Sequence, residues 1–180
     1  MLFKASGVRD NRSVLAELFL MSGLLLAKPE TATLASLPSG ETDTRVAIHV
    51  AGAQDRPSDA RALLRDLNSV RAARGLSPLT LEPRLCDLAR QHALDMVAHR
   101  FFGHASSDGA SPFQRMHRAG YEYNAAGENL ALDVDEPSAQ QMLWRSNAHR
   151  ENMLEPKFAR VGIAAVATDN GTLFVEDFSD

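Results

Sequence analysis

Three short stretches of the sequence carry side chains that could bind a ligand or do chemistry. The stretch FFGH ends in His104, GENL contains Glu128, and SNAHREN contains His149. Two imidazole nitrogens and one carboxylate oxygen are ordinary ligands of Zn²⁺, with a fourth position left for water. The same three groups could instead transfer protons. The residue types alone leave both chemistries open.

The spacing of these residues decides what the fold must do. His104, Glu128 and His149 are too far apart in sequence to share one helix face, so only tertiary structure could bring them together. The sequence contains no HExxH motif, no G-x-S-x-G motif and a single cysteine, Cys86. Cys86 lies between two leucines and is interpreted as a small packed hydrophobe. The common zinc-protease and serine-hydrolase patterns are therefore absent.

Length and composition indicate one globular domain with an N-terminal tail. The chain has 180 residues, 44% of them hydrophobic, and a formal net charge of −4. The sequence has no long basic run, which argues against nucleic acid as a partner.

The N-terminal segment, residues 1–35, resembles a secretory signal. Basic residues precede the apolar run at 18–27, and small residues follow it. The run is too short to span a bilayer as a helix, so the mature chain is expected to have no transmembrane span. An amphipathic helix or a misplaced start codon is the alternative. We expect a secreted or periplasmic protein, and a cytoplasmic one if this segment is not a signal.

The remaining chain is divided into a linker at 36–58 and a folded domain at 59–180. The linker contains RVAIHV, a possible short strand. In the domain, apolar periodicity and capping residues predict helices at 58–73, 83–99, 111–120 and 137–146. A strand is expected in the second half of YEYNAAGENLAL, and a hairpin around Asn170-Gly171. This irregular order favours an α+β fold with a mainly antiparallel sheet.

The order of several motifs resembles the CAP superfamily, which includes cysteine-rich secretory proteins, venom antigen 5 and plant pathogenesis-related proteins. The motifs are the segment ending in FFGH, then AGY, GENL, a tryptophan, HRENML, VGIA and LFVEDF. They extend from about residue 62 to residue 180. The chain is most similar to the small bacterial branch, often called SCP-like.

This resemblance implies a three-layer α-β-α sandwich, secretion, and a central cleft. By motif, His104 and His149 match the two cleft histidines, and Glu128 matches the acid of the GENL motif. In some animal members this cleft resembles a Zn²⁺ site. The chain departs from the pattern at Asn147, where animal members carry a second acid, and at Glu176, where the last strand usually carries a glutamine. Glu176 could add charge to the cleft floor or face solvent.

Three functions follow from these expectations. The first is an exported, non-enzymatic CAP module whose cleft of His104, Glu128 and His149 binds a small ligand or a divalent metal, possibly Zn²⁺. Its surface would meet a cell-envelope or extracellular partner. The second is a zinc-dependent, peptidase-like hydrolase using the same cleft, and the third is a lipid-binding protein. A purely structural alternative is that Glu128 only holds His149 and a loop in place.

Overall fold

The computed structural model describes residues 3–4 and 53–180. The helices in these residues are α1 (Pro57–Ala72), α2 (Pro83–His99), α3 (Pro112–Arg118), α4 (Glu136–Arg145) and α5 (Asn147–Met153). The strands are β1 (Phe3–Lys4), β2 (Gln54–Asp55), β3 (Thr80–Leu81), β4 (Ala126–Asp133), β5 (Arg160–Thr168) and β6 (Gly171–Ser179). The described helices include none that is both long and apolar enough to cross a bilayer.

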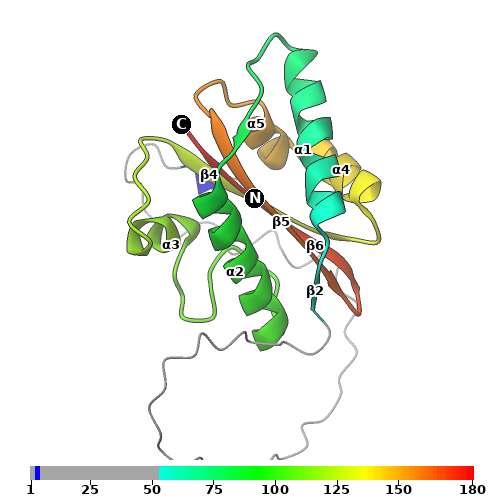
Figure 1. The fold of residues 1–180 in the computed structure, drawn as a ribbon, viewed down its shortest axis with the longest axis vertical. Helices are drawn as coiled ribbons and strands as arrows, with labels where there is room; N and C mark the ends of the chain where they lie inside the picture. Colours follow the sequence, from blue (N-terminus) through cyan, green and yellow to red (C-terminus); the bar gives the residue numbers. More distant parts are fainter. Residues whose placement is uncertain (1–2, 5–52) are drawn as a thin grey trace, which may run out of the picture. The chain divides into compact units, whose positions relative to one another are not determined.

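The centre of the fold is a sheet in which β6 lies between β4 and β5 (Figure 1). Both pairings are antiparallel, and β5 and β6 form the hairpin expected at Asn170-Gly171. The two-residue strands extend the edges: β1 pairs with β4, while β2 and β3 pair with β5. Only the β3–β5 pairing is parallel among the described strands. The mainly antiparallel sheet predicted from the sequence is thus confirmed.

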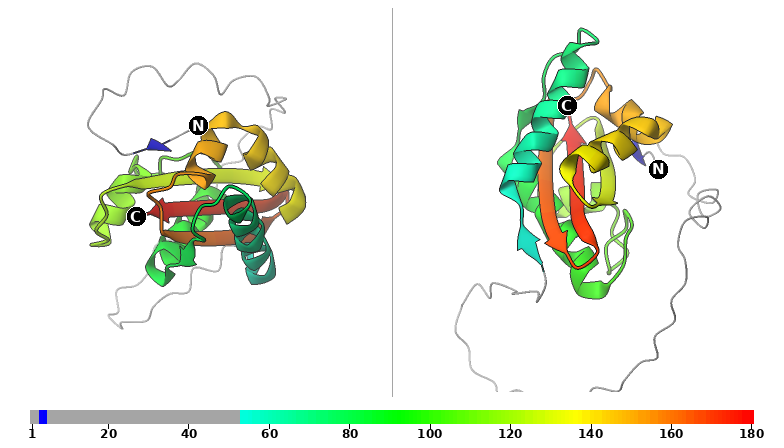
Figure 2. Two further views of the ribbon diagram at one scale, coloured as in Figure 1. Left: turned by 90° about the horizontal axis from the view of Figure 1, so that it is seen from above. Right: turned by 90° about the vertical axis from the view of Figure 1, so that its right-hand side faces the viewer.

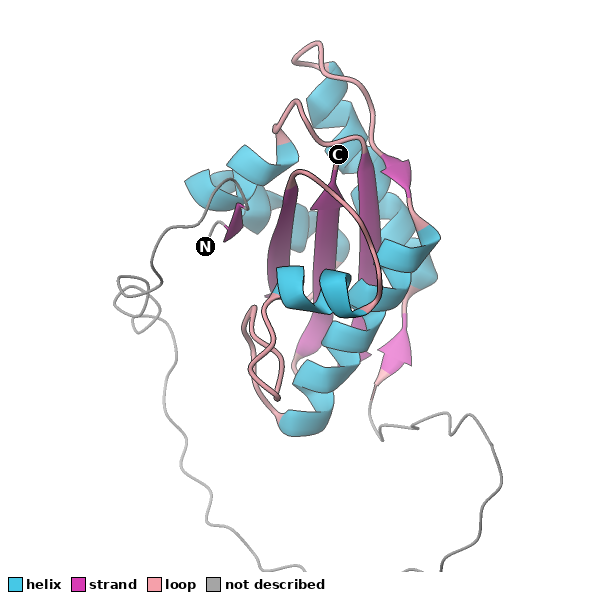
Figure 3. Ribbon diagram, turned by 90° about the vertical axis from the view of Figure 1, so that its left-hand side faces the viewer, coloured by secondary structure: helices cyan, strands magenta, loops and turns pink. Residues whose placement is uncertain are grey.

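Helices cover both faces of this sheet (Figures 2 and 3). One face packs against α2 and α3, through clusters that include Met96 and Met116. The other face packs against α1, α4 and α5, through a cluster that includes Leu67, Leu143 and Met153. The described domain is therefore the expected three-layer α-β-α sandwich.

Helix α2 lies unusually close to the sheet because β5 carries a glycine at the contact. A Cβ atom on Gly162 would lie 2.1 Å from the backbone carbon of Leu85. No side chain fits there, so the missing Cβ lets the helix backbone approach the strand directly. This close packing fixes α2, and with it the start of the loop that carries His104.

Helix α1 is anchored at its C-terminal end by a buried arginine. The Arg71 guanidinium is fully buried and donates hydrogen bonds to the carbonyl oxygens of Ser77, Met153, Glu155 and Phe158, over 2.9–3.1 Å. A planar guanidinium satisfies several carbonyl groups at once. Arg71 therefore ties α1 to the segment that joins α5 to β5.

Most predicted elements are confirmed with small shifts at their ends. Helix α3 has the complete capping box of Ser111 and Gln114. The helix expected at 58–73 begins one residue earlier, at Pro57, so Ser58 does not cap it; Arg56 occupies the cap position without a side-chain bond. The short helix α5 was not predicted. The signal-like segment and RVAIHV lie outside the described residues, apart from strand β1.

Candidate functional site

The buried carboxylate of Glu128, on β4, is the centre of the candidate site. Its side chain is fully buried, and its Oε1 lies 2.7 Å from His104 Nδ1. Its Oε2 forms an ion pair with Nη2 of Arg115 on α3. Both oxygens are therefore engaged by cationic or hydrogen-bonding groups from the α2–α3 side of the sheet. The structure brings together His104 and Glu128, as the sequence predicted, and adds Arg115.

The loop after α2 holds His104 in position from both ends. Arg100 ends the helix in the left-handed conformation, with φ of 54°, which turns the chain back toward the sheet. Farther along, His92 Nε2 lies 2.9 Å from the carbonyl oxygen of Gly103. Arg115 Nη1 donates to the carbonyl oxygen of His104 at 2.8 Å. His92 is buried, and its hydrogen bond to Gly103 ties α2 to this loop.

A second buried carboxyl group, that of Asp177, lies beside Glu128. The two residues are direct partners in the antiparallel pairing of β4 with β6. Burial, and after it the charge of Glu128, raises the pKa of Asp177 well above its usual value of 3.8. Burial raises the pKa of Glu128 too, but the Arg115 charge opposes that rise. Because Arg115 binds Glu128, we assign the negative charge to Glu128 and the proton to Asp177.

His149 lies on α5, in the layer on the opposite face of the sheet from α2 and α3. Ser146 caps this helix by accepting a hydrogen bond from His149 N at 3.4 Å. The Asn129 side chain donates to the carbonyl oxygen of His149 at 3.3 Å. Burial lowers the pKa of His149 to about 4, and the positive charge of His104 contributes to this fall. The two imidazoles are therefore electrostatically coupled, and His149 is neutral at pH 7.

The residues present do not fit a three-ligand zinc site through Glu128. Its two oxygens contact His104 and Arg115, and a guanidinium already neutralises the charge that would attract a cation. Within residues 3–4 and 53–180, no group of three His, Cys, Asp or Glu side chains has an arrangement that could hold a metal ion. The two imidazoles alone fall short of the three protein ligands of a catalytic zinc.

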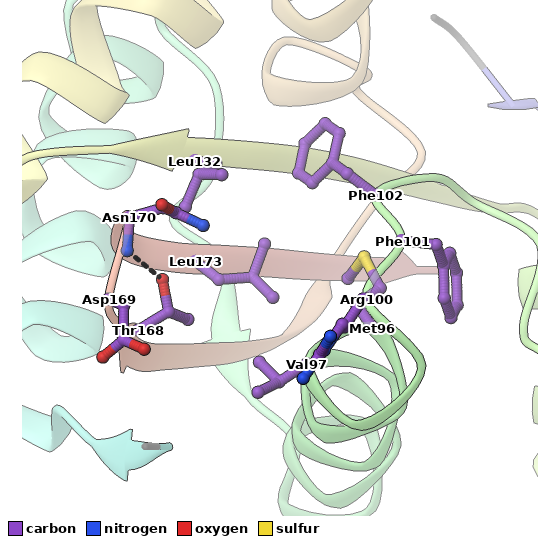
Figure 4. A pocket seen from close by; sticks show the side chains of 10 residues that line it. All are labelled: Met96, Val97, Arg100, Phe101, Phe102, Leu132, Thr168, Asp169, Asn170 and Leu173. Carbon is purple, nitrogen blue, oxygen red and sulfur yellow. Dashed lines mark hydrogen bonds between the residues drawn. The ribbon is translucent and has the colours of Figure 1, made fainter. Parts of the chain in front are cut away.

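A separate apolar groove lies on the α2 face, toward the β5–β6 turn (Figure 4). Its volume is about 550 Å³. Leu132 and Leu173 of the sheet, together with Met96 of α2, form much of its surface, and Phe102 projects over it. Leu132 lies four residues after Glu128 on β4, on the same face of the strand. The groove is therefore near the site along the strand, but none of the site residues lines it.

Both the sequence and the fold are similar to those of known proteins. Residues 64–178 match the cysteine-rich secretory protein family, CAP, over more than half of the chain. The chain belongs to the CAP family. Among its relatives, the YkwD protein of Bacillus subtilis is 34% identical over 112 residues. That alignment covers 62% of this chain but 43% of YkwD, so the CAP chain described here spans less than half of that relative.

Two solved structures of bacterial proteins share this fold. An outer surface protein from Borrelia burgdorferi aligns with a TM-score of 0.67 at 24% identity, covering 72% of this chain and 98% of the Borrelia protein. An extracellular protein containing an SCP domain, from Bacillus anthracis, aligns with a TM-score of 0.62 at 25% identity. The second alignment covers 68% of this chain and 40% of the Bacillus anthracis protein. These likenesses agree with the bacterial branch inferred from the motifs.

Sequence reasoning missed two ionisable members of this CAP site, Arg115 and Asp177. Arg115 sits inside the capped helix 111–120, where a lone arginine gives no sign of facing inward. Asp177 lies in the last strand, and only the β4–β6 register brings it beside Glu128. Asn147, at the place of the second acid of animal members, instead accepts a hydrogen bond from Arg150 at 2.5 Å. Glu176 is fully buried, so the expectation that it could face solvent is wrong.

Proposed function

We propose that this chain is an exported, non-enzymatic CAP module whose cleft of His104, Glu128 and His149 binds a small polar ligand. The 2.7 Å contact between His104 and Glu128 carries this proposal. A carboxylate that fixes the orientation of an imidazole favours ligand binding, because the ring then loses little conformational entropy when the ligand binds. The side chain of His104 is only 11% exposed, which suits a small molecule better than a macromolecular surface.

The charges of the site support binding over catalysis. Glu128 is paired with Arg115 and His104, so it is poorly placed to activate water. His149, with a pKa of about 4, is a weak base at neutral pH. A zinc-dependent hydrolase would also need a third protein ligand in place of Glu128. Binding without turnover is therefore the function that this set of groups serves best.

A fragment screen by NMR tests the proposed cleft directly. Small polar compounds should shift the amide signals of His104, Glu128 and His149 in the wild-type protein. The same compounds should lose this effect in His149→Ala but keep it in Glu151→Ala, an exposed change on the same helix. Binding that is equal in both variants, or that maps elsewhere, would overturn the proposal.

Calorimetric titration with Zn²⁺ distinguishes metal binding from the binding of a small polar ligand. Because Arg115 already neutralises Glu128, we expect no stoichiometric heat of zinc binding. A one-to-one heat that disappears in both His104→Ala and His149→Ala would instead establish a metal site. Peptide cleavage that requires both zinc and Glu128 would then point to the hydrolase.

Export to an extracellular or envelope location is part of the same proposal. The similar Borrelia protein is an outer surface protein and the Bacillus anthracis protein is extracellular. Residues 1–35 have the composition of a signal, although they lie largely outside the described structure. N-terminal sequencing of the protein from culture medium should begin near residue 36. An intact Met1 found only in the cytosol would refute export.

Lipid binding is the second candidate function, and the groove beside α2 favours it. A groove of about 550 Å³ with an apolar floor has the size of small-molecule pockets. Phe102 and Leu132 at this groove are 47% and 37% exposed, so both offer apolar surface to a ligand. A long-chain fatty acid should then bind the wild type and not Leu132→Asp. Equal binding by both proteins would remove this alternative.

A further inference from the structure

Glu176 is a buried acid on β6 that the proposed cleft does not use. It is fully buried on the face that packs against α1, α4 and α5, opposite to the face of Glu128 and Asp177. Its Oε2 accepts a hydrogen bond from Asn129 Nδ2 at 3.0 Å. Its Oε1 is buried and has no hydrogen-bond partner in the part of the chain that the structure describes. Such a group normally has a structural or functional reason to be retained.

Asn129, which donates a hydrogen bond to Glu176, also holds α5 on the sheet. The Nδ2 group of Asn129 donates both to Glu176 and to the carbonyl oxygen of His149. Asn152, on the same helix as His149, donates to Asn129 Oδ1 at 3.0 Å and to the carbonyl oxygen of Glu128 at 3.2 Å. These two amides therefore connect the His149 helix to the strand that carries Glu128, and Glu176 lies at the end of the network.

The surroundings of Glu176 favour its neutral form. On the neighbouring strands it faces Asn129 of β4 and Ile163 of β5, neither of which is charged. From α4, the charge of Glu136 acts on it. No described cation forms an ion pair with Glu176. Burial raises its pKa to about 7; the hydrogen bond from Asn129 opposes this rise, and the Glu136 charge adds to it.

An ionised Glu176 would need more hydrogen-bond donors than this interior supplies. Among the described residues, Asn129 is the side chain that donates to Glu176, and a buried charge with so little compensation is strongly unfavourable. Water could supply the missing hydrogen bonds, but only if the helices of this face move away from the sheet. The polar network makes α5 the helix whose movement would release the contact to Asn129.

We propose that Glu176 is a positioning residue for the cleft, which holds α5, and thus His149, against β4 only while its carboxyl group is neutral. The assignment rests on the proposed function for the role of His149 as a ligand contact. The positioning itself needs no ligand and acts through the contacts of Glu176, Asn129 and Asn152. Raising the pH through neutrality therefore loosens α5 and changes the geometry of the site.

Hydrogen exchange of the full chain, without any ligand, tests this inference. After correction for the intrinsic pH effect on exchange, opening of α5 in the wild type should increase roughly tenfold between pH 6 and pH 8. Glu176→Gln, which keeps the shape and stays neutral, should show no such increase. Glu151→Gln, an exposed change on α5, should behave like the wild type. An equal increase in Glu176→Gln, or none in the wild type, would overturn the inference.

A second variant keeps the test decisive if Glu176→Gln does not fold. Glu136→Gln removes the negative charge that helps to keep Glu176 neutral. The midpoint of α5 opening should then move to lower pH, and an unchanged midpoint would contradict the role of Glu176. Because no ligand is present, this result is independent of the fragment screen. Loss of ligand binding with intact pH-dependent opening would refute only the proposed function.

Discussion

Glu128 and Asp177 face each other across the β4–β6 pairing, with exposed fractions of 0% and 1%. One ionised carboxylate is stabilised there by Arg115, and the adjacent acid keeps its proton. The pair resembles carboxyl dyads in which one proton is shared because two adjacent charges cannot coexist in a buried site. Its charge state controls both the stability of the domain and the electrostatics felt by His104.

Replacing Asp177 by asparagine should stabilise the protein most at alkaline pH. The folded-state pKa of Asp177 is raised, so its contribution to stability falls as the pH rises above 3.8, its ordinary value. Asparagine is neutral in both folded and unfolded states and avoids this loss. Urea unfolding should show Asp177→Asn more stable than wild type at pH 8, with little difference near pH 4. A pH-independent difference would contradict the assignment of the proton.

Replacing Glu128 by glutamine should destabilise the fold because Arg115 loses its buried counter-charge. The cost of leaving one member of a buried ion pair alone is roughly 3–5 kcal/mol. Chemical denaturation of Glu128→Gln at pH 7 measures it. The double variant Arg115→Met with Glu128→Gln should recover part of the loss, since no uncompensated charge remains. Additive losses in the double variant would show that the two side chains do not act as a pair.

Gly162 offers a packing test that is independent of charge. The methyl group of Gly162→Ala would overlap the backbone of α2 at Leu85, a contact that small rotamer changes cannot relieve. The expected loss is roughly 3 kcal/mol or more, with failure to fold as the extreme. Gly103→Ala is the matched control, because nothing lies within 4 Å of its added Cβ. Thermal melts in which both variants lose the same stability would refute the close contact.

Arg71 should not tolerate lysine, although the positive charge is retained. A lysine ammonium cannot reproduce the planar fork that reaches carbonyl oxygens of Ser77, Met153, Glu155 and Phe158 together. Leaving some of these buried carbonyls without donors should cost roughly 2–4 kcal/mol. Guanidinium unfolding of Arg71→Lys provides the measurement, with Arg74→Lys, at an exposed position, as the control. Equal denaturation midpoints for the two variants would argue against this role of the Arg71 hydrogen bonds.

The sequence was informative where local chemistry determines structure. The capping box at Ser111, the proline at the start of α2 and the Asn170-Gly171 turn each act within a few residues, and each element formed as predicted. Helix α5 was missed because a seven-residue helix depends on packing against the sheet more than on its own propensity. Ser146, which caps α5, is a residue type typical of a helix start, but alone it does not predict a helix.

The charged partners of the site could not be deduced because they depend on register. Strand β6 is covered by helices on both faces, so Glu176 and Asp177 are both buried and show no polar–apolar alternation. Only the pairing of β4 with β6 reveals that Asp177 faces Glu128 while Glu176 faces Asn129. The motif comparison predicted His104, Glu128 and His149. It did not indicate which side chain balances the charge of Glu128.

The two imidazoles belong to different layers, and this has an evolutionary consequence. His104 and its carboxylate partner are held by the loop after α2, by α3 and by β4, whereas His149 lies on α5 and is tied to β4 through Asn129. Mutations in α5 or its capping turn would therefore shift one ring while the charged triad of His104, Glu128 and Arg115 stays intact. Under the proposed function, sequence change within this single seven-residue helix would alter ligand selectivity without rebuilding the scaffold that keeps the domain folded.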